Sequence, residues 1–387
     1  MLLALFTLAT TVAATTLEVD SNGFSTFKID GLVAATFTPF DENFNIDTTQ
    51  IDKQAAWLNF TGVRYAFVSG TTGESVKLTL AERYSQAEAW LTVAPKYNLQ
   101  CIIHVGDESI ENARAMAVHA EKHGAHAFAA MSSAFFKPVS TEALAQYMAA
   151  IASAAPTIPF LYYHIPSMTG VAFADGMFGF VQEMDSLGVN NFIGVKYTGL
   201  YTFPGFMDAT RILNYKNGKY QVLCGRDEMM LEALAAGITG FVGSQYNFIG
   251  DYYNAIRAAW AANNITQARV LQNTAIDMIS AWGDVPAGVD GCKNVFNCAT
   301  GAAVPKVGDA RLPSVPITDD AIDGLTTNVQ HWCKSSASAS KTHLCTAMPW
   351  SGGPLWKEPI YMFVRVYFEL WGRNIYLFMD NCIIYSK

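Results

Sequence analysis

Phe192-Ile193-Gly194-Val195-Lys196-Tyr197-Thr198-Gly199 is an apolar run that is typical of a buried strand and ends with a lysine and a Thr-Gly turn. An ammonium group at the carboxyl end of a buried strand is costly unless it is solvated or paired, and burial lowers the pKa of a lysine. The neutral amine that results can attack a ketone and form a Schiff base. A lysine that merely extends from the strand toward solvent is the alternative, and this stretch alone does not decide between the two.

Similar runs recur on both sides of this stretch, between residues 31 and 245, and alternate with helical patterns. The expected strands are residues 32–38, 65–69, 101–105, 127–131, 160–164, 192–196, 221–224 and 240–244. Eight strand–helix units in this length predict an α/β protein with a (β/α)8 TIM barrel. A doubly wound open sheet needs a glycine-rich dinucleotide turn after its first strand, and Thr36-Phe37-Thr38-Pro39 is not such a turn.

The helical segments between the runs carry N-terminal capping signals. Thr79 precedes an amphipathic segment and has Glu82 three residues later, which predicts a capping box. We expect Ser109 and Thr141 to be the N-caps of the segments 109–123 and 141–154. Helical patterns at residues 252–262 and 266–282 follow the eighth run, so we expect additional C-terminal helices.

The two ends of the chain differ from this middle part. We place the barrel domain at residues 29–327 and treat residues 328–387 as an appended tail of unknown role. Charged residues interrupt the aromatic-rich part of this tail, so it offers no span of ~20 apolar residues for a membrane helix. Residues 1–15 contain an apolar run that resembles a secretory signal without a basic start, which leaves the compartment open between cytoplasmic and secreted.

Composition narrows the possible partners. The chain has 387 residues, of which 51% are hydrophobic, and this is enough for a large core. Its net charge is −8 and its basic residues are scattered, so we expect no nucleic-acid surface. Of its seven cysteines, Cys101 and Cys224 fall in strand-like runs and are expected to be buried. The cysteines form no CxxC pair and have no histidine at zinc-finger spacing, so we expect no metal site; whether the late cysteines pair stays open.

Polar residues gather where the expected strands end, which is where the chemistry of such barrels takes place. In chain order they are Thr71 and Thr72, Tyr163 and His164, Lys196, Gly225-Arg226-Asp227-Glu228, and Ser244. Adjacent strand residues point to opposite faces, so Tyr163 and His164 cannot both face the site, and we interpret His164 as structural. This convergence predicts a single site at the carboxyl end of the barrel.

Each polar segment also has a plain structural interpretation. The hydroxyls and backbone amides of Gly70-Thr71-Thr72-Gly73-Glu74 suit a small carboxylate, although the segment is also typical of a capping turn. Tyr163 is either a proton relay or a packed residue at the barrel rim. Asp227 and Glu228 either accept hydrogen bonds from a polyol or simply favour the first turn of a helix.

Taken in order, four motifs resemble the N-acetylneuraminate lyase and dihydrodipicolinate synthase superfamily. They are Gly-Thr-Thr-Gly-Glu at 70–74, Tyr-Tyr-His-Ile-Pro-Ser-Met-Thr-Gly at 162–170, Gly-Val-Lys-Tyr-Thr-Gly at 194–199 and Gly-Arg-Asp-Glu at 225–228. The resemblance implies a metal-independent class I pyruvate aldolase on a TIM barrel that assembles as a homotetramer. The chain is most similar to the sialic-acid lyase branch, because Met168 stands where a synthase would place an arginine for a second carboxylate.

The resemblance also implies roles for the site residues. Lys196 would form the Schiff base, Tyr163 would be the general acid/base at the C4 hydroxyl, and Thr71 and Thr72 would bind the substrate carboxylate. The residues that would hold the hydroxylated chain are Thr198, Gly225, Asp227, Glu228 and Ser244. The implied reaction is reversible cleavage of N-acetylneuraminate to pyruvate and N-acetylmannosamine, with no metal or organic cofactor and no nucleic-acid or membrane partner. A 2-keto-3-deoxy sugar acid aldolase, a dihydrodipicolinate synthase-like enzyme and a non-catalytic binding homologue remain as alternatives.

Overall fold

Eight parallel strands close into a barrel in a computed structural model of the chain, in the order β1 to β8. The structure describes residues 18–20, 25–199, 202–283, 289–299, 303–314, 317–334 and 342–347. The strands are β1 (Gly31–Ala35), β2 (Tyr65–Val68), β3 (Gln100–His104), β4 (Ala127–Met131), β5 (Phe160–His164), β6 (Phe192–Tyr197), β7 (Gln221–Cys224) and β8 (Gly240–Gly243). Because β1 pairs with both β2 and β8, the sheet has no open edge, and the predicted (β/α)8 barrel is confirmed.

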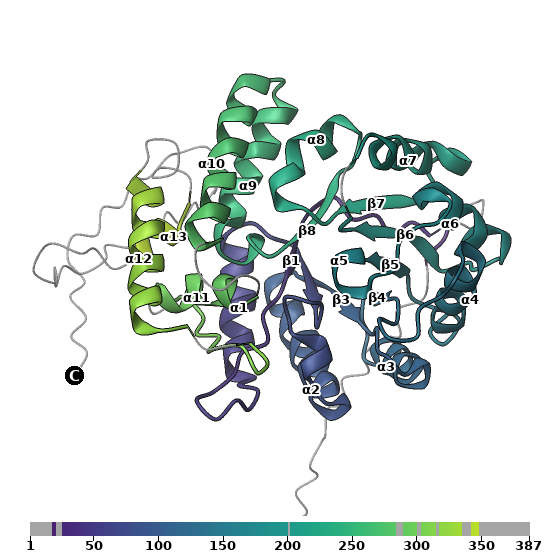
Figure 1. Ribbon diagram of the computed structural model, residues 1–387, viewed down its shortest axis with the longest axis horizontal. Helices are drawn as coiled ribbons and strands as arrows, with labels where there is room; N and C mark the ends of the chain where they lie inside the picture. Colours follow the sequence, from purple (N-terminus) through teal and green to yellow (C-terminus); the bar gives the residue numbers. More distant parts are fainter. Residues whose placement is uncertain are drawn as a thin grey trace, which may run out of the picture. The chain divides into compact units, whose positions relative to one another are not determined.

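Helices follow the strands and surround the barrel, as Figure 1 shows. They are α1 (Thr49–Phe60), α2 (Leu80–Val93), α3 (Ile110–Lys122), α4 (Thr141–Ala152), α5 (Pro166–Thr169), α6 (Gly176–Ser186), α7 (Phe203–Asn214) and α8 (Met230–Ala235). The capping box of Thr79 and Glu82 is present at the start of α2, and Ser109 caps α3. The N-cap predicted at Thr141 is wrong by one residue: Ser140 has the extended backbone of an N-cap and accepts from the Ala143 amide.

The strands are buried on both faces, and this divides the core into two layers. One set of alternate strand residues, including Phe67, Leu161 and Tyr163, fills the inside of the barrel. The other set, including Tyr162, packs against the helices. The predicted separation of Tyr163 from its neighbour His164 is confirmed, because the His164 ring stacks on Phe173 outside the inner cluster.

Helices beyond the eighth strand gather beside β1 and β8 (Figure 1). They are α9 (Tyr246–Ala261), α10 (Ile265–Gly283), α11 (Val289–Cys298), α12 (Asp319–Lys334) and α13 (Leu344–Ala347). The domain limit predicted at residue 327 falls inside α12. The apolar run at residues 1–15 and most of the predicted tail (335–341 and 348–387) lie outside the described residues.

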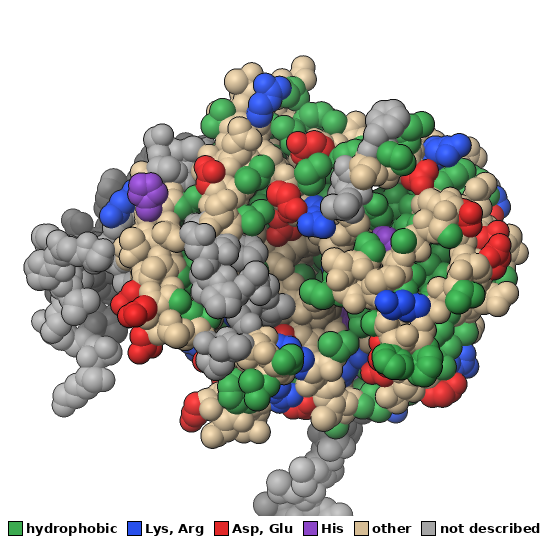
Figure 2. Space-filling model, viewed as in Figure 1, with side chains coloured by type: hydrophobic (Ala, Val, Ile, Leu, Met, Phe, Trp, Pro, Cys, Tyr) green, Lys and Arg blue, Asp and Glu red, His purple; other side chains and the backbone are tan. Residues whose placement is uncertain are grey.

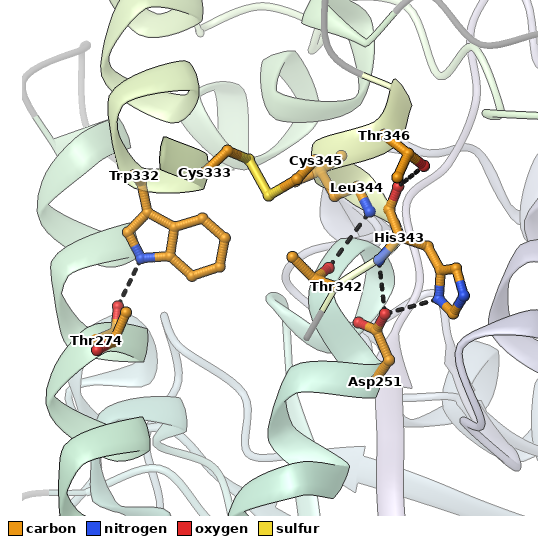
Figure 3. The surroundings of a disulfide bond; sticks show 9 residues. All are labelled: Asp251, Thr274, Trp332, Cys333, Thr342, His343, Leu344, Cys345 and Thr346. Atoms are coloured by element: carbon orange, nitrogen blue, oxygen red, sulfur yellow. Dashed lines mark hydrogen bonds and ion pairs between the residues drawn. A yellow bond between two sulfur atoms is a disulfide. The ribbon is translucent and has the colours of Figure 1, made fainter. Parts of the chain in front are cut away.

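A disulfide joins the last two described helices. Cys333 of α12 is bonded to Cys345 of α13, as Figure 3 shows. Beside it, the backbone amide and the ring Nδ1 of His343 each lie 2.7 Å from a carboxylate oxygen of Asp251 on α9. Trp332 donates its indole N–H to the Thr274 carbonyl of α10 at 2.6 Å. These hydrogen bonds attach the end of the described chain to the helices next to the barrel. The disulfide answers the open question of the late cysteines for two of them, Cys333 and Cys345.

The charges on the surface and the lengths of the helices can be compared with the expectations about nucleic-acid and membrane partners. On the face that Figure 2 draws, lysine and arginine side chains are interspersed with acidic ones and do not form one continuous basic patch. Among the described helices, none combines the length and the apolar character that a bilayer crossing requires. Cys101 and Cys224 are buried, as their strand-like runs predicted.

Candidate active site

Lys196 lies near the carboxyl end of β6 and points into the barrel. Its side chain is buried, with 3% of the residue exposed. The ammonium nitrogen lies 3.7 Å from the centre of the Tyr163 ring and 4.2 Å from the centre of the Phe67 ring. Tyr163 is the register partner of Lys196 in the neighbouring strand β5, so both side chains share the inner face of the sheet. Among the described residues, the Lys196 amine is therefore covered by aromatic faces and has no paired carboxylate.

This burial changes the protonation of Lys196. Removal from water lowers its pKa to about 7, and the negative charge of Asp227 opposes part of that shift. A lysine with this pKa is substantially unprotonated at neutral pH, whereas an ordinary lysine is almost fully charged. The arrangement supplies a nucleophilic amine inside a barrel mouth.

Tyr163 is positioned by its neighbours on both sides. Its hydroxyl lies 3.1 Å from the Thr71 hydroxyl, and the ring meets those of Phe67 and His104 edge-on. Burial raises the pKa of Tyr163 to about 12, and its hydrogen bond with Thr71 opposes part of this shift. The phenol therefore keeps its proton at neutral pH and can donate or relay it to a group bound beside Lys196.

The threonine turn after β2 connects two other loops of the barrel. Thr71 contacts Tyr163 at the end of β5, while the Thr72 hydroxyl lies 2.7 Å from that of Ser244, which follows β8. Thr72 is buried, and Thr71 and Ser244 are partly exposed. The structure thus brings together the residues that the sequence predicted for carboxylate binding.

Asp227 begins a short 3₁₀ helix (Asp227–Met229) after β7. Its carboxylate accepts a 2.9 Å hydrogen bond from the Gln245 amide, and burial raises its pKa to about 7. A side chain at Gly243 is impossible here, because a Cβ atom would lie 1.5 Å from the Asp227 Oδ1. Glu228 lies further out, about one-third exposed, and pairs with Arg226 at 3.4 Å.

Thr198 and Gly225 lie next to each other at the ends of β6 and β7. A Cβ atom at residue 225 would approach the Thr198 hydroxyl oxygen to 2.4 Å, so this close contact requires glycine. The Thr198 hydroxyl oxygen is buried and is not within hydrogen-bond geometry of any described residue. A buried hydroxyl of this kind gains from a ligand that hydrogen-bonds to it.

A buried ion pair beneath the threonine turn was not anticipated from the sequence. The ammonium of Lys293 on α11 lies 2.7 Å from one oxygen of Glu74, and both side chains are almost completely buried. The other Glu74 oxygen accepts from Lys77 at 3.1 Å and from the Arg311 amide at 2.9 Å. Glu74 has a left-handed backbone with φ of 56°, a conformation that these contacts help to hold. If Glu74 is buried in this glycine-framed turn, its carboxylate requires a positively charged partner. The sequence does not indicate which lysine is that partner.

His104 is a second residue that sequence reasoning missed. Its Nδ1 lies 2.8 Å from the Ser69 carbonyl, and its ring packs edge-on against Tyr163. Burial and the positive charges of Arg83 and Lys196 hold the pKa of His104 well below its usual value. The ring is therefore neutral, so its part in the site is to support the phenol and the loop after β2.

Met168 stands where the resemblance places an arginine in a synthase. It lies on α5 and is 63% exposed. A thioether carries no charge and only a weak acceptor, so this position cannot form the bidentate contact that an arginine makes with a carboxylate.

Comparisons with known proteins identify the family of this chain. The sequence profile of the dihydrodipicolinate synthetase family matches residues 28–332. N-acetylneuraminate lyase of Danio rerio is 36% identical over 296 residues, which is 75% of this chain and 92% of the relative. N-acetylneuraminate lyase of Gallus gallus is 35% identical over 298 residues, which is 76% of this chain and 93% of the relative.

Solved structures show the same similarity. The structure of N-acetylneuraminate lyase (sialic acid aldolase) from Aliivibrio salmonicida superposes with a TM-score of 0.73 at 31% identity. That alignment covers 79% of this chain and 97% of the other. The N-acetylneuraminate lyase of Proteus mirabilis also gives a TM-score of 0.73, at 29% identity, and the alignment covers 79% of this chain and 99% of that one.

Proposed function

The chain belongs to the dihydrodipicolinate synthetase family, and from this premise we propose that it is a class I aldolase that reversibly cleaves N-acetylneuraminate to pyruvate and N-acetylmannosamine. The observation that carries the proposal is the buried Lys196 amine, whose pKa is lowered to about 7 beside the Tyr163 phenol. The relatives that share most of the chain's length and carry the name N-acetylneuraminate lyase support this choice of substrate.

In the proposed reaction Lys196 attacks the ketone carbon of the sugar acid. Loss of water leaves a protonated imine, which accepts the electron pair of the C3–C4 bond as that bond breaks. The C4 hydroxyl must lose its proton in the same step, and Tyr163 takes it while passing its own proton to the substrate carboxylate. The enamine that remains is protonated at C3, and water then releases pyruvate and regenerates the amine.

The remaining site residues hold the substrate in this proposal. Thr71 and Thr72 bind the carboxylate through hydroxyls and backbone amides, which an acidic protein needs because its overall field repels anions. The residues that hold the hydroxylated chain are Thr198, Gly225, Asp227, Glu228 and Ser244. Of this set, the Thr198 hydroxyl oxygen and the Asp227 side chain are buried.

Electron withdrawal comes from the imine in this mechanism, so it needs neither a metal nor an organic cofactor. We further propose that the enzyme works as a homotetramer. Phe135 and Phe136, at 80% and 83% exposed, support this, since paired exposed aromatic rings are typical of protein contact surfaces. Light scattering after gel filtration measures the assembly directly.

The proposal is tested by trapping the imine. The protein is incubated with pyruvate and sodium borohydride, and peptides are mapped by mass spectrometry. We expect a reduced pyruvyl adduct on Lys196, and no adduct in K196A. Absence of the adduct from folded wild-type protein would overturn the Schiff-base mechanism.

The aldehyde partner is identified in a second step. N-acetylmannosamine is offered together with pyruvate, and formation of N-acetylneuraminate is measured. Adduct formation without this product would retain the aldolase and reject the sialic-acid assignment, in favour of another 2-keto-3-deoxy sugar acid.

A further inference from the structure

Three metal-ligating side chains meet on the outer surface of the helical layer, away from the barrel mouth. Glu88 lies on α2, and His119 and His123 lie on the neighbouring helix α3. The two histidines are four residues apart on a helix, so their rings lie on the same face one turn apart. The expectation of no metal site rested on cysteine spacing and on zinc-finger histidines, and these two helical histidines belong to neither pattern.

The three donor atoms are already close together. His119 Nε2 lies 2.8 Å from Glu88 Oε1, and His123 Nε2 lies 4.0 Å from the same oxygen. One donor atom from each residue lies within 4.8 Å of the other two. Tetrahedral zinc at ~2.0–2.1 Å from each ligand requires donor atoms about 3.3–3.5 Å apart, which falls between the observed separations.

Neighbouring rings restrict the orientation of the histidines. The two imidazoles stack at 4.1 Å between ring centres, and the Tyr84 ring lies 4.3 Å from His119. Ordering ligands before binding lowers the entropic cost of closing a metal site. The side chains of His119 and His123 are 16% and 35% exposed, so an ion from solvent reaches them without a change in the fold.

We propose that Glu88, His119 and His123 form a binding site for a divalent transition metal ion of the zinc class, which joins α2 to α3. Two imidazoles and one carboxylate suit this class of ion and leave one position for water. The site stands apart from Lys196, so it is independent of the Schiff-base reaction and acts as a clamp between two helices of the outer layer. A plain His119–Glu88 ion pair is the competing interpretation, and metal titration separates the two.

The test is calorimetric titration of chelator-treated protein with zinc chloride at pH 7.5. We expect one strong site per chain and a higher melting temperature in the presence of zinc. H123Q and E88Q should each weaken binding at least about tenfold and abolish the thermal shift. H331A, which removes an exposed histidine from α12, is the matched control and should bind zinc as the wild type does.

The zinc titration and the adduct experiment test the metal site and the aldolase reaction separately. Equal zinc affinity in the wild type, H123Q and E88Q, or no binding by the wild type, would overturn the site. Circular dichroism and the pyruvate–borohydride adduct on Lys196 show that each variant is folded. Failure of the adduct would count against the aldolase alone, because zinc binding requires no catalytic residue.

Discussion

Lys196 and Lys293 are both buried lysines near the same threonine turn, and their surroundings are opposite. Lys196 has two aromatic faces and no paired carboxylate among the described residues, whereas Lys293 is 2.7 Å from Glu74. Burial without a counter-ion favours the neutral amine, while a bonded carboxylate favours the ammonium. The presence or absence of a paired carboxylate, rather than burial itself, therefore decides whether a buried lysine is a nucleophile or a structural cation.

The largest effect is expected from the unpaired lysine. K196A removes the amine that forms the imine in the proposed reaction, so cleavage of N-acetylneuraminate should fall below detection in an assay of released pyruvate. K53A, which removes an exposed lysine, is the control and should keep wild-type activity. Measurable turnover by K196A at rates near wild type would remove the basis of the comparison.

The next largest effect concerns the ring that covers Lys196. Y163F keeps the aromatic face but removes the hydroxyl, so kcat should fall by about 10²–10⁴, the usual contribution of a positioned acid or base. The borohydride adduct with pyruvate should persist, because the amine is intact. Y97F, at a partly buried tyrosine–aspartate contact on the surface layer, serves as the control. Loss of the adduct in Y163F would show that the hydroxyl is needed for imine formation as well.

Substitution of Lys293 should lower the stability of the fold. K293M leaves the Glu74 carboxylate buried with one partner fewer, and breaking a buried pair in this way costs about 3–5 kcal/mol of unfolding free energy. Urea denaturation measures this loss, and KM for the sugar acid should rise because Glu74 holds the Thr71–Thr72 turn. The double variant E74Q/K293M should recover part of the stability, whereas additive losses would argue against a coupled pair.

Methionine in place of Lys196 should raise the free energy of unfolding, whereas methionine in place of Lys293 should lower it. A buried amine with a pKa of about 7 binds fewer protons than the unfolded chain between that pH and its usual value of 10.5. The cost of burying the charge is therefore complete below pH 7 and disappears above 10.5. K196M should raise the free energy of unfolding at pH 6 by up to about 5 kcal/mol, with a smaller gain at pH 10. An equal gain at both pH values would show that packing, and not charge, is responsible.

The smallest effect is a shift in pH dependence. Imine formation with pyruvate should increase as the pH rises through about 7, where Lys196 loses its proton. Asp227 raises the pKa of Lys196, so D227N should move this midpoint to a lower pH. Rates of adduct formation across pH 5–9 measure both midpoints. A shift toward higher pH in D227N would contradict the assigned coupling.

Local sequence pattern was sufficient to predict the barrel and the meeting of polar side chains at the carboxyl ends of its strands. Strand–helix alternation predicted all eight strands within a few residues, and the two-residue period separated Tyr163 from His164. The carboxyl ends of parallel strands meet by geometry, which placed Thr71 next to Tyr163 without knowledge of the fold's details.

The missed features depend on contacts between distant segments. Glu74 and Lys293 are 219 residues apart, and no periodicity links a turn to a helix beyond the barrel. The need for glycine at residue 243 arises from the Asp227 carboxylate, which packs against it from the end of another strand. Ser140 and Thr141 are both good caps, and only the backbone conformation decides between them.

The pairing of β1 with β8 has a consequence for synthesis on the ribosome. β1 can pair with β2 early, but Gly31 pairs with Gly240 of β8, so the second partner of β1 is complete only after 209 further residues have been made. At about 5–20 residues per second this takes roughly 10–40 s, during which one edge of β1 is unpaired. Unpaired edges can pair with other strands, so this interval is when the nascent chain is most exposed to aggregation. The ion pair of Glu74 with Lys293 forms later still, which makes the turn that contains Glu74 one of the last parts of the protein to mature.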